Sequence, residues 1–192
     1  MHLQLTPELL LRAYAMGVFP MGDESGAIAW YSPDPRCIFD LERFHVPRRL
    51  LRTIRQGGFE MAVNGAWSEV LRSCAERDTT WINEEICHAY TRLHEMGYAH
   101  TVEAYKDGKL AGGLYGVAIG GAFFGESMFH KVTDASKVCL VYLVERLKQR
   151  GFRLLDSQYM TSHLSTFGAV TISRQEYLLR LEQALRLDCR FD

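Results

Sequence analysis

Apolar positions follow a helical period through much of the first 97 residues and a strand-like pattern after them. Within 67–76, for example, apolar side chains recur at the three- and four-residue spacing of an amphipathic helix, whereas 100–106 alternates as a strand with one buried face does. The pattern predicts helices over 6–16, about 47–56, 67–76, 83–97, 134–150 and from 173 onward, and strands over 100–106, within 110–129 and over 152–157.

Capping and turn residues mark where these elements begin and end. Thr6, followed by Pro7, has the typical sequence of a helix N-terminus. Asp134 is expected to cap the long helix that follows it, and the last helix begins with a capping box that starts at Ser173. The stretch 17–35 is predicted as a turn-rich connection.

The order of these elements predicts an α+β fold. A small helical N-terminal subdomain, residues 1–97, precedes a C-terminal subdomain, residues 98–192, in which strands and helices alternate. Because no Ser/Gly-rich linker separates the two, we expect packed subdomains and not independent domains.

Composition and charge agree with a globular protein of the cytoplasm. The chain has 192 residues, 47% of them hydrophobic, and a formal net charge of −1. Its five cysteines are odd in number and never spaced C-x-x-C, which favours reduced thiols over disulfides or a zinc ribbon. The long uncharged run 110–125 is too short and too rich in glycine for a membrane span, and the N-terminus does not resemble an export signal.

Several common chemistries are disfavoured by incomplete motifs. His94-Glu95 lacks the second histidine of a zinc protease, because Tyr98 occupies that position. The run 125–129 lacks the second glycine of a serine hydrolase motif. Neither a Walker loop nor G-x-G-x-x-G is present, so NTPases and dinucleotide enzymes are disfavoured too.

A series of short motifs, taken in order, is much more specific than any one of them. The series is W-Y-S-P-D-P-R (30–36), T-W-I (80–82), G-G-L-Y-G (112–116), G-E-S-M-F (125–129), A-S-K (135–137) and D-S-Q (156–158). In this order the motifs closely resemble those of the bacterial leucyl/phenylalanyl-tRNA–protein transferases, from about residue 6 to residue 177.

The resemblance implies an enzyme that moves Leu, Phe or Met from aminoacyl-tRNA onto proteins that begin with Arg or Lys. The product carries a destabilising N-terminus that marks it for degradation. The resemblance also implies a C-terminal subdomain similar to the GNAT acetyltransferases, with no metal and no small-molecule cofactor. We expect a monomer that meets tRNA and acceptor proteins and no membrane.

Two alternatives stay open. The first is a GNAT-like acyltransferase that uses acyl-CoA, although the segment 131–137 before the long helix lacks the glycines of a pyrophosphate loop. The second is a tRNA-binding module without catalytic activity.

Asp156 and Gln158 are the candidate catalytic residues. They are two apart on a predicted strand, so their side chains are expected to share a face. Asp156 can then accept from the Gln158 side-chain amide and orient its carbonyl oxygen toward the incoming α-amine, which is the role that the family resemblance implies for the pair. The alternative is a strand end that satisfies its own turn.

Glu126 is the candidate acceptor-binding residue. It follows the uncharged run, so we expect it to be partly buried, where a carboxylate needs a partner. The cationic side chain of an N-terminal Arg or Lys is a suitable partner. An internal base such as Lys137 is the alternative.

A pocket for Leu, Phe or Met must be apolar. Leu140, Leu143 and Leu147 share one face of the long helix, and the resemblance adds Leu114, Phe123, Met128 and Leu155 around the same side chain. The alternative is that this stripe belongs to the core.

The tRNA end is expected to meet aromatic and basic residues. Trp81 and Tyr14 match family positions in the region that stacks on the terminal adenosine, whereas Met21 stands where some relatives have Trp. A basic face suited to phosphates is predicted on the helix of about 47–56, with a solvated helix face as the alternative. Its members are Arg48, Arg49, Arg52 and Arg55.

Overall fold

The computed structural model describes residues 5–23, 25–76 and 80–192, and these form α-helices and strands in mixed order. The helices are α1 (Pro7–Ala15), α2 (Arg48–Arg55), α3 (Trp67–Ala75), α4 (Glu84–Glu95), α5 (Ala135–Gln149), α6 (Ser162–Ser165) and α7 (Arg174–Leu185), with a short 3-10 helix at Leu41–Arg43. The strands are β1 (Phe19–Gly22), β2 (Ile28–Tyr31), β3 (Arg36–Phe39), β4 (Glu60–Val63), β5 (Ala99–Lys106), β6 (Lys109–Ile119), β7 (Ala122–His130), β8 (Leu154–Gln158) and β9 (Val170–Ile172).

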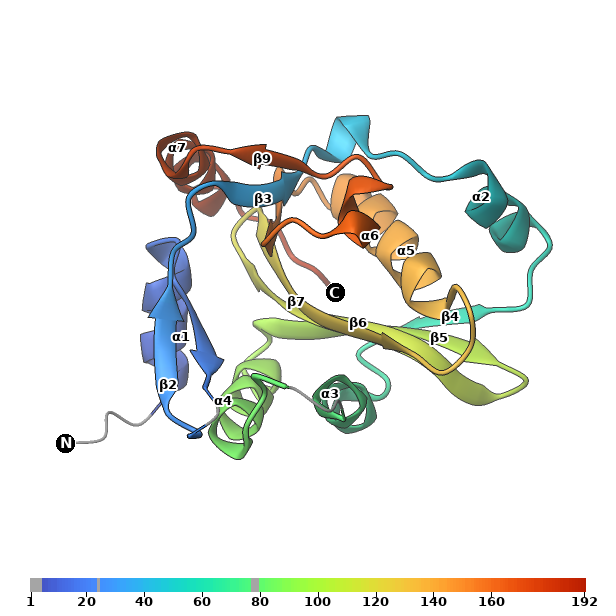
Figure 1. Cartoon of the computed structure of the whole chain (residues 1–192), viewed down its shortest axis with the longest axis horizontal. Coiled ribbons are helices and arrows are strands. Elements are labelled where there is room, and N and C mark those ends of the chain that lie inside the picture. The colour runs from blue at the N-terminus through green and yellow to red at the C-terminus, as the bar shows by residue number, and fades with distance from the viewer. Residues whose placement is uncertain (1–4, 24, 77–79) are drawn as a thin grey trace.

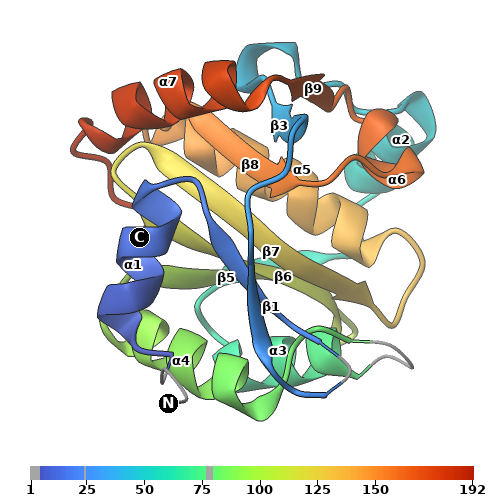
Figure 2. The ribbon, with the colours of Figure 1, turned by 60° about the vertical axis from the view of Figure 1, so that its left-hand side comes forward.

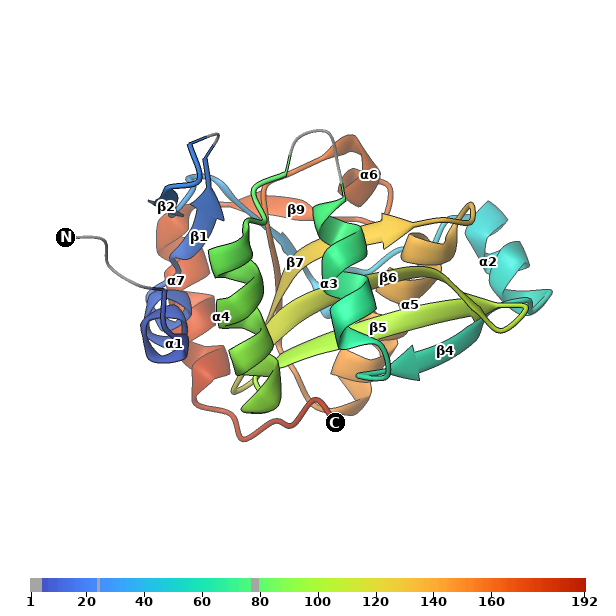
Figure 3. The same cartoon turned by 90° about the horizontal axis from the view of Figure 1, so that it is seen from below.

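A seven-stranded sheet in the order β4-β5-β6-β7-β8-β3-β9 forms the centre of the molecule. Helix α5 covers one face of the sheet, with α2 packed beside it, and α3 and α4 cover the other face (Figures 1 and 3). Helices α1 and α7 meet at one end, and β1 and β2 form a separate antiparallel ribbon (Figure 2). Two hydrophobic cores result, one on each side of the sheet.

The strands β7 and β8 run parallel and separate after a short pairing. Their register ends at Phe124 and Asp156, and beyond that point β7 continues to His130 paired only with β6. Because the two strands diverge there, the sheet opens between Gly125 and the end of β8. This opening positions the candidate site.

A glycine of the G-G-L-Y-G motif allows the close approach of β6 to β7. A Cβ atom on Gly116 would lie 2.3 Å from the carbonyl oxygen of Phe124 and 2.4 Å from the ring of Phe123. Both distances are far below van der Waals contact, so any side chain at this position would push β7 away from β6. The close packing of β6 against β7 therefore explains why this position of the motif is a glycine.

The helices expected from the sequence are confirmed, as are most of their caps. The side chains of Thr6, Asn83 and Ser173 accept hydrogen bonds from backbone N–H groups of α1, α4 and α7. The cap predicted at Asp134 is wrong, because this residue has a φ of 68° and its carboxylate makes no capping hydrogen bond.

The strands β3, β4 and β9 were not expected, and all three belong to the seven-stranded sheet. The stretch 17–35, predicted as a turn-rich connection, contains the paired strands β1 and β2. The mixed α+β class and the helical N-terminal segment are confirmed. The expected boundary at residue 97 falls in the turn between α4 and β5, and strands from both sides of it share one sheet. None of the helices in the described part of the chain is long and apolar enough to cross a membrane.

Candidate active site

A pocket of about 280 Å³ opens where β7 and β8 separate. Its polar wall is formed by 125–127 from β7 and by 157–159 at the end of β8 and directly after it. Its remaining walls come from the β1 region, the segment before α4, apolar residues of β6, β7 and β8, helix α5 and helix α6. Segments from most of the chain thus meet around one cavity.

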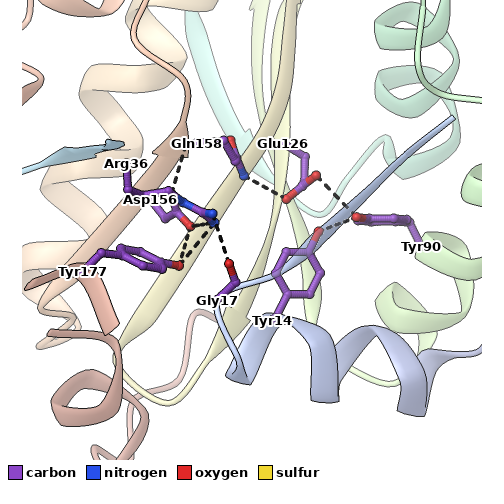
Figure 4. A network of polar contacts seen from close by, with 8 residues as sticks. All are labelled: Tyr14, Gly17, Arg36, Tyr90, Glu126, Asp156, Gln158 and Tyr177. Carbon is purple, nitrogen blue, oxygen red and sulfur yellow. Dashed lines mark hydrogen bonds and ion pairs between the residues drawn. The ribbon is translucent and has the colours of Figure 1, made fainter. Parts of the chain in front are cut away.

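Glu126 lies in this wall at a β-bulge. In the β6–β7 register Tyr115 pairs with Ser127 and Gly116 pairs with Gly125, so Glu126 is the extra residue of β7. A bulge bends the strand and redirects the side chain at the extra position. Here the bulge brings the Glu126 side chain to the pocket, toward Gln158 (Figure 4).

The Glu126 carboxyl group is held by neutral donors. Its Oε1 accepts from Nε2 of Gln158 at 3.2 Å, and its Oε2 accepts from the hydroxyl of Tyr90 at 3.4 Å. The Tyr90 hydroxyl also hydrogen-bonds the Tyr14 hydroxyl (Figure 4). Burial raises the pKa of Glu126 to about 8, because none of these donors supplies a full positive charge. The same burial, together with the charge of Glu126, raises the pKa of both tyrosines well above 10.0, which keeps them protonated as donors.

The predicted interaction between the side chains of Asp156 and Gln158 is wrong in its geometry. Oδ1 of Asp156 accepts from the backbone N–H of Gln158 at 2.9 Å, and the Gln158 side chain donates to Glu126 instead. The alternation of the strand is broken by a register shift against β3 and by a φ of 55° at Gln158. The two side chains therefore point in different directions from the same strand end.

Asp156 is fully buried behind the pocket in a cluster with Arg36 and Tyr177. Arg36 donates to both carboxylate oxygens, with Nε–Oδ1 at 2.9 Å and Nη2–Oδ2 at 2.6 Å, and the hydroxyl of Tyr177 donates to Oδ2 at 2.7 Å. The guanidinium lies over the rings of Phe19 and Tyr177 and donates to the carbonyl oxygen of Gly17 at 3.1 Å. Asp156 does not line the pocket, so its influence on bound substrates passes through Gln158.

The apolar residues proposed for the side-chain pocket divide into wall and core. Five of the expected residues line the pocket: Leu114, Met128, Leu140, Leu143 and Leu155. Leu164 of α6, which was not expected, lines it too. Phe123 and Leu147 were also expected there, but both are fully buried in the core and do not line the pocket. Leu147 lies two turns of α5 beyond Leu140, too far along the helix to reach the opening.

Of the two aromatic residues expected at the tRNA end, the structure brings one to the pocket. Trp81 lines it and is held beside β1 by a backbone hydrogen bond from Gly22 to the Trp81 carbonyl at 2.9 Å. Met21 lines the same region. Tyr14 is fully buried against Phe124, with ring centroids 4.8 Å apart, so the expectation that a base stacks on Tyr14 is wrong.

The arginines expected to form a basic face are all exposed on α2. Arg48, Arg52 and Arg55 share one face of the helix by their spacing, and Arg49 turns toward Asp134, with Nη2 4.0 Å from Oδ2. Lys137, the internal partner considered for Glu126, instead donates to Oδ1 of Asp134 at 2.7 Å.

Residues important to the site were missed by the sequence reading. Arg36 and Tyr177 hold Asp156, Tyr90 holds Glu126, and α6 supplies a pocket wall. One signal was available, because Arg36 directly precedes the apolar run 37–39 and a charge in such a setting requires a buried partner. Tyr90 and Tyr177 occupy ordinary inward positions of amphipathic helices, which carry no such signal.

The raised pKa of Glu126 predicts a pH-dependent stability difference between the wild type and Glu126→Gln. The folded wild type keeps a proton on Glu126 up to a pH of about 8, whereas the unfolded chain loses it near the ordinary value of 4.5. The free energy of unfolding of the wild type should therefore fall, relative to the variant, as the pH rises from 4.5 to 8, by at most about 1.4 kcal/mol per pH unit. Urea titrations at pH 5, 6.5 and 8 measure this difference, and a constant difference would contradict it.

Comparison with known proteins identifies the family. Residues 4–34 match the model of the leucyl/phenylalanyl-tRNA protein transferase N-terminal domain, and residues 38–182 match that of leucyl/phenylalanyl-tRNA protein transferase. The chain is 55% identical over 192 residues to a leucyl/phenylalanyl-tRNA--protein transferase of Gloeobacter violaceus, with 100% of both chains covered. It is 52% identical over 190 residues to the protein of that name from Rubrobacter xylanophilus, covering 98% of this chain and 100% of the other.

Among solved structures the chain is similar to FemX, with a TM-score of 0.55 and 11% identity over 86% of this chain and 66% of that one. At this identity the likeness concerns the fold alone, and it agrees with the expected GNAT-like architecture. The two family models together account for most of the chain, and the relatives match it from end to end. The chain therefore belongs to the leucyl/phenylalanyl-tRNA protein transferase family and is an aminoacyltransferase.

Proposed function

We propose that the protein transfers Leu, Phe or Met from aminoacyl-tRNA to the α-amino group of proteins that begin with Arg or Lys, and thereby marks them for degradation. The observation that carries this proposal is the placement of Glu126 and Gln158 side by side at the polar wall of an otherwise leucine-rich pocket. The pocket offers an apolar site for one side chain and, at Glu126, a carboxyl group that can pair with a cationic one.

The apolar wall suits the donor amino acid. Leucine and methionine side chains from β6, β7, β8, α5 and α6 surround the inner part of the pocket. Leu, Phe and Met are unbranched at Cβ, and burial of such a side chain contributes about 1.5–3 kcal/mol of binding free energy. The ester carbonyl of the bound aminoacyl group then lies toward the polar wall.

The polar wall suits the acceptor. A cationic side chain next to Glu126 replaces its proton with a fixed charge, which turns a costly buried carboxyl group into an ion pair. The Gln158 amide nitrogen is already engaged by Glu126, so the amide presents Oε1 as its acceptor for the α-amine. The cluster of Asp156 and Arg36 fixes the backbone from which this amide projects.

The reaction needs positioning more than strong acid–base catalysis. An α-amino group has a pKa of about 7.7–8.0, so a substantial fraction is neutral and nucleophilic near neutral pH. Its nitrogen attacks the ester carbon, the new C–N bond forms, and the C–O bond to the terminal ribose breaks. The amine loses one proton and the ribose oxygen gains one. Holding the two reactants in this geometry contributes most of the rate increase.

The function is tested by incubating the protein with Leu-tRNA or Phe-tRNA and a peptide that begins with Arg. Mass spectrometry should find one added residue on the α-amine of this peptide and none on a matched peptide that begins with Ala. Addition to both peptides would contradict the acceptor rule. tRNA binding without any addition would instead favour a binding module.

The basic face of α2 predicts a salt-dependent contribution to tRNA binding. Arg52→Met should weaken binding several-fold and reduce the slope of log Kd against log salt concentration by about 0.7–0.9, as expected when one phosphate contact is lost. Fluorescence titrations at several KCl concentrations measure both quantities. Arg43→Met is the matched control, since its side chain is 87% exposed but lies outside α2. Equal slopes for Arg52→Met and the wild type would contradict the contact.

A further inference from the structure

The A-S-K motif at the start of α5 borders a second cavity. This cavity also has a volume of about 280 Å³, and it is lined by His130, Asp134, Ser136 and Lys137 together with two residues of the first pocket, Met128 and His163. It therefore adjoins the side-chain pocket, although none of its polar groups has a role in the chemistry described above.

The N-terminus of α5 lacks a side-chain cap at this cavity. Asp134 has a left-handed backbone conformation, and its carboxylate accepts from Lys137 at 2.7 Å instead of capping the helix. The helix is 15 residues long, so its N-terminal end carries the positive pole of the helix dipole. The A-S-K motif thus combines a helix N-terminus with a lysine.

Two polar groups at the cavity have no partner in the described part of the chain. Ser136 is only 6% exposed, lines the cavity, and its hydroxyl makes no hydrogen bond there. The Nε2 atom of His163 is fully buried and also has no partner. Buried polar atoms normally find a partner, so the buried Nε2 of His163, together with the Ser136 hydroxyl at the same cavity, points to a ligand that hydrogen-bonds both.

The charges at the cavity favour an anion. Lys137 and Arg49 flank the carboxylate of Asp134, so the cations outnumber the anion. Burial lowers the pKa of His163, and the nearby Lys137 and His130 lower it further. Arg49 comes from α2, so the basic helix reaches a residue that lines this cavity.

We propose that this cavity binds a backbone phosphate of the donor tRNA near its 3′ end, held by the Ser136 hydroxyl, the Lys137 ammonium, the His163 ring and the N-terminus of α5. The proposal rests on the proposed function and adds a binding site to it. A phosphate offers several acceptor oxygens and a negative charge, which match the donors and the positive potential at this cavity. Its capture fixes the nucleotides that precede the aminoacyl ester.

The test combines neutral phosphate analogues with variants of the cavity. An RNA hairpin that carries the single-stranded 3′ end is made with a methylphosphonate at one phosphate at a time. A methylphosphonate at one of these positions should weaken binding to the wild type about tenfold. The same substitution should weaken binding to Lys137→Met less than twofold. The salt slope of Lys137→Met should also be about 0.7 smaller. Lys148→Met is the matched control, because Lys148 lies on the same helix with 42% of its side chain exposed against 39% for Lys137.

A second variant guards against a loss of folding. Ser136→Asp adds a negative charge to the cavity at the second residue of α5, where an acidic side chain is favourable to the helix. At a temperature where circular dichroism shows that this variant is folded, it should bind the unmodified hairpin about tenfold more weakly and show no loss of affinity for the critical methylphosphonate. If each methylphosphonate weakened binding to both variants as much as it weakens binding to the wild type, the proposal would be overturned.

Inorganic phosphate tests whether the cavity binds a free phosphate ion or a phosphate of the tRNA backbone. Inorganic phosphate could shift the His163 ring resonances in NMR spectra while Lys137→Met removes the affinity loss of no methylphosphonate. In that case the cavity binds a free anion, and the tRNA assignment is overturned. Transfer of Leu or Phe by the wild type is measured separately. If transfer is intact but Lys137→Met does not change the effect of any methylphosphonate, only the phosphate site is overturned. If Lys137→Met does change that effect but no transfer is found, only the proposed reaction is overturned.

Discussion

Asp156→Asn is expected to lower the free energy of unfolding by about 3–5 kcal/mol, the range found when one partner of a buried ion pair is removed. The wild-type carboxylate receives two hydrogen bonds from Arg36, one from Tyr177 and one from the backbone of Gln158. Asparagine has the same shape, but its amide nitrogen is a donor that faces other donors. It also leaves the guanidinium without a counter-charge in the interior. Urea unfolding followed by circular dichroism measures the change.

Tyr177→Phe is the matched control for this prediction. It removes the hydrogen bond to the same carboxylate oxygen and a longer one from Nη2 of Arg36 at 3.3 Å, and it changes no charge, so it should cost only about 1–2 kcal/mol. A similar cost for both variants would show that the charge of Asp156 contributes little. A cost below 1 kcal/mol for Asp156→Asn would contradict the ion pair itself.

Asp156→Asn should also reduce the rate of transfer at temperatures where the variant remains folded. Oδ1 of Asp156 fixes the backbone N–H of Gln158, a residue that already has a left-handed backbone. A shift of about 1 Å in a positioning group can cost about 100-fold in rate. We therefore expect kcat to fall at least about tenfold at a temperature where the variant is fully folded. An unchanged kcat would show that Gln158 is held by other contacts.

Except for the four-residue helix α6 (Ser162–Ser165), the helices of this fold were predictable because their information is local. Each has a run of apolar residues at helical spacing, and Thr6, Asn83 and Ser173 provide caps that the structure confirms. The burial of Glu126 was also predictable, because a single carboxyl group follows a long uncharged run. Neither inference needs knowledge of which segments meet in space.

The strand β3 was not predictable in the same way. It has only four residues, all buried, and it follows a turn-rich segment. Its place in the sheet depends on pairing with β8 and β9, more than 100 residues later in the chain. A short, fully buried strand shows no alternation of apolar and polar residues.

The orientation of the catalytic candidates was not predictable either. The spacing of Asp156 and Gln158 implies one shared face only if the strand is regular through both residues. The register shift against β3 and the positive φ of Gln158 violate that condition, and neither leaves a mark in the sequence, because Gln is not a typical residue for this backbone conformation. Backbone irregularities of this kind occur at functional sites.

Glu126→Gln is expected to reduce kcat/KM for a peptide that begins with Arg by about 30- to 1000-fold, equivalent to about 2–4 kcal/mol for the loss of a close charge pair. Glutamine keeps the shape of the side chain and an oxygen that accepts from Gln158, so the pocket should stay intact. It cannot provide a negative charge to the acceptor side chain. The Kd for tRNA should change less than threefold, because the phosphate contacts lie elsewhere.

A peptide that begins with citrulline tests whether this loss comes from the charge. Citrulline resembles Arg in shape but is neutral, so the wild type should use it poorly and Glu126→Gln should use it no worse than the wild type does. Equal losses on both peptides would instead place Glu126 in the chemistry of transfer or in the support of Gln158.

The pH dependence of acceptor binding provides an independent measurement of the same interaction. Below a pH of about 8 the Glu126 carboxyl group carries a proton, and a cationic acceptor must displace it. The affinity of the wild type for the Arg peptide should therefore rise with pH, by at most tenfold per pH unit, and level off above pH 8. The α-amine of the peptide titrates in the same range, but its contribution is common to the wild type and Glu126→Gln. The ratio of their Kd values, measured by calorimetry with uncharged tRNA present, isolates Glu126, and a ratio independent of pH from 6 to 9 would exclude an ion pair between this carboxylate and the acceptor.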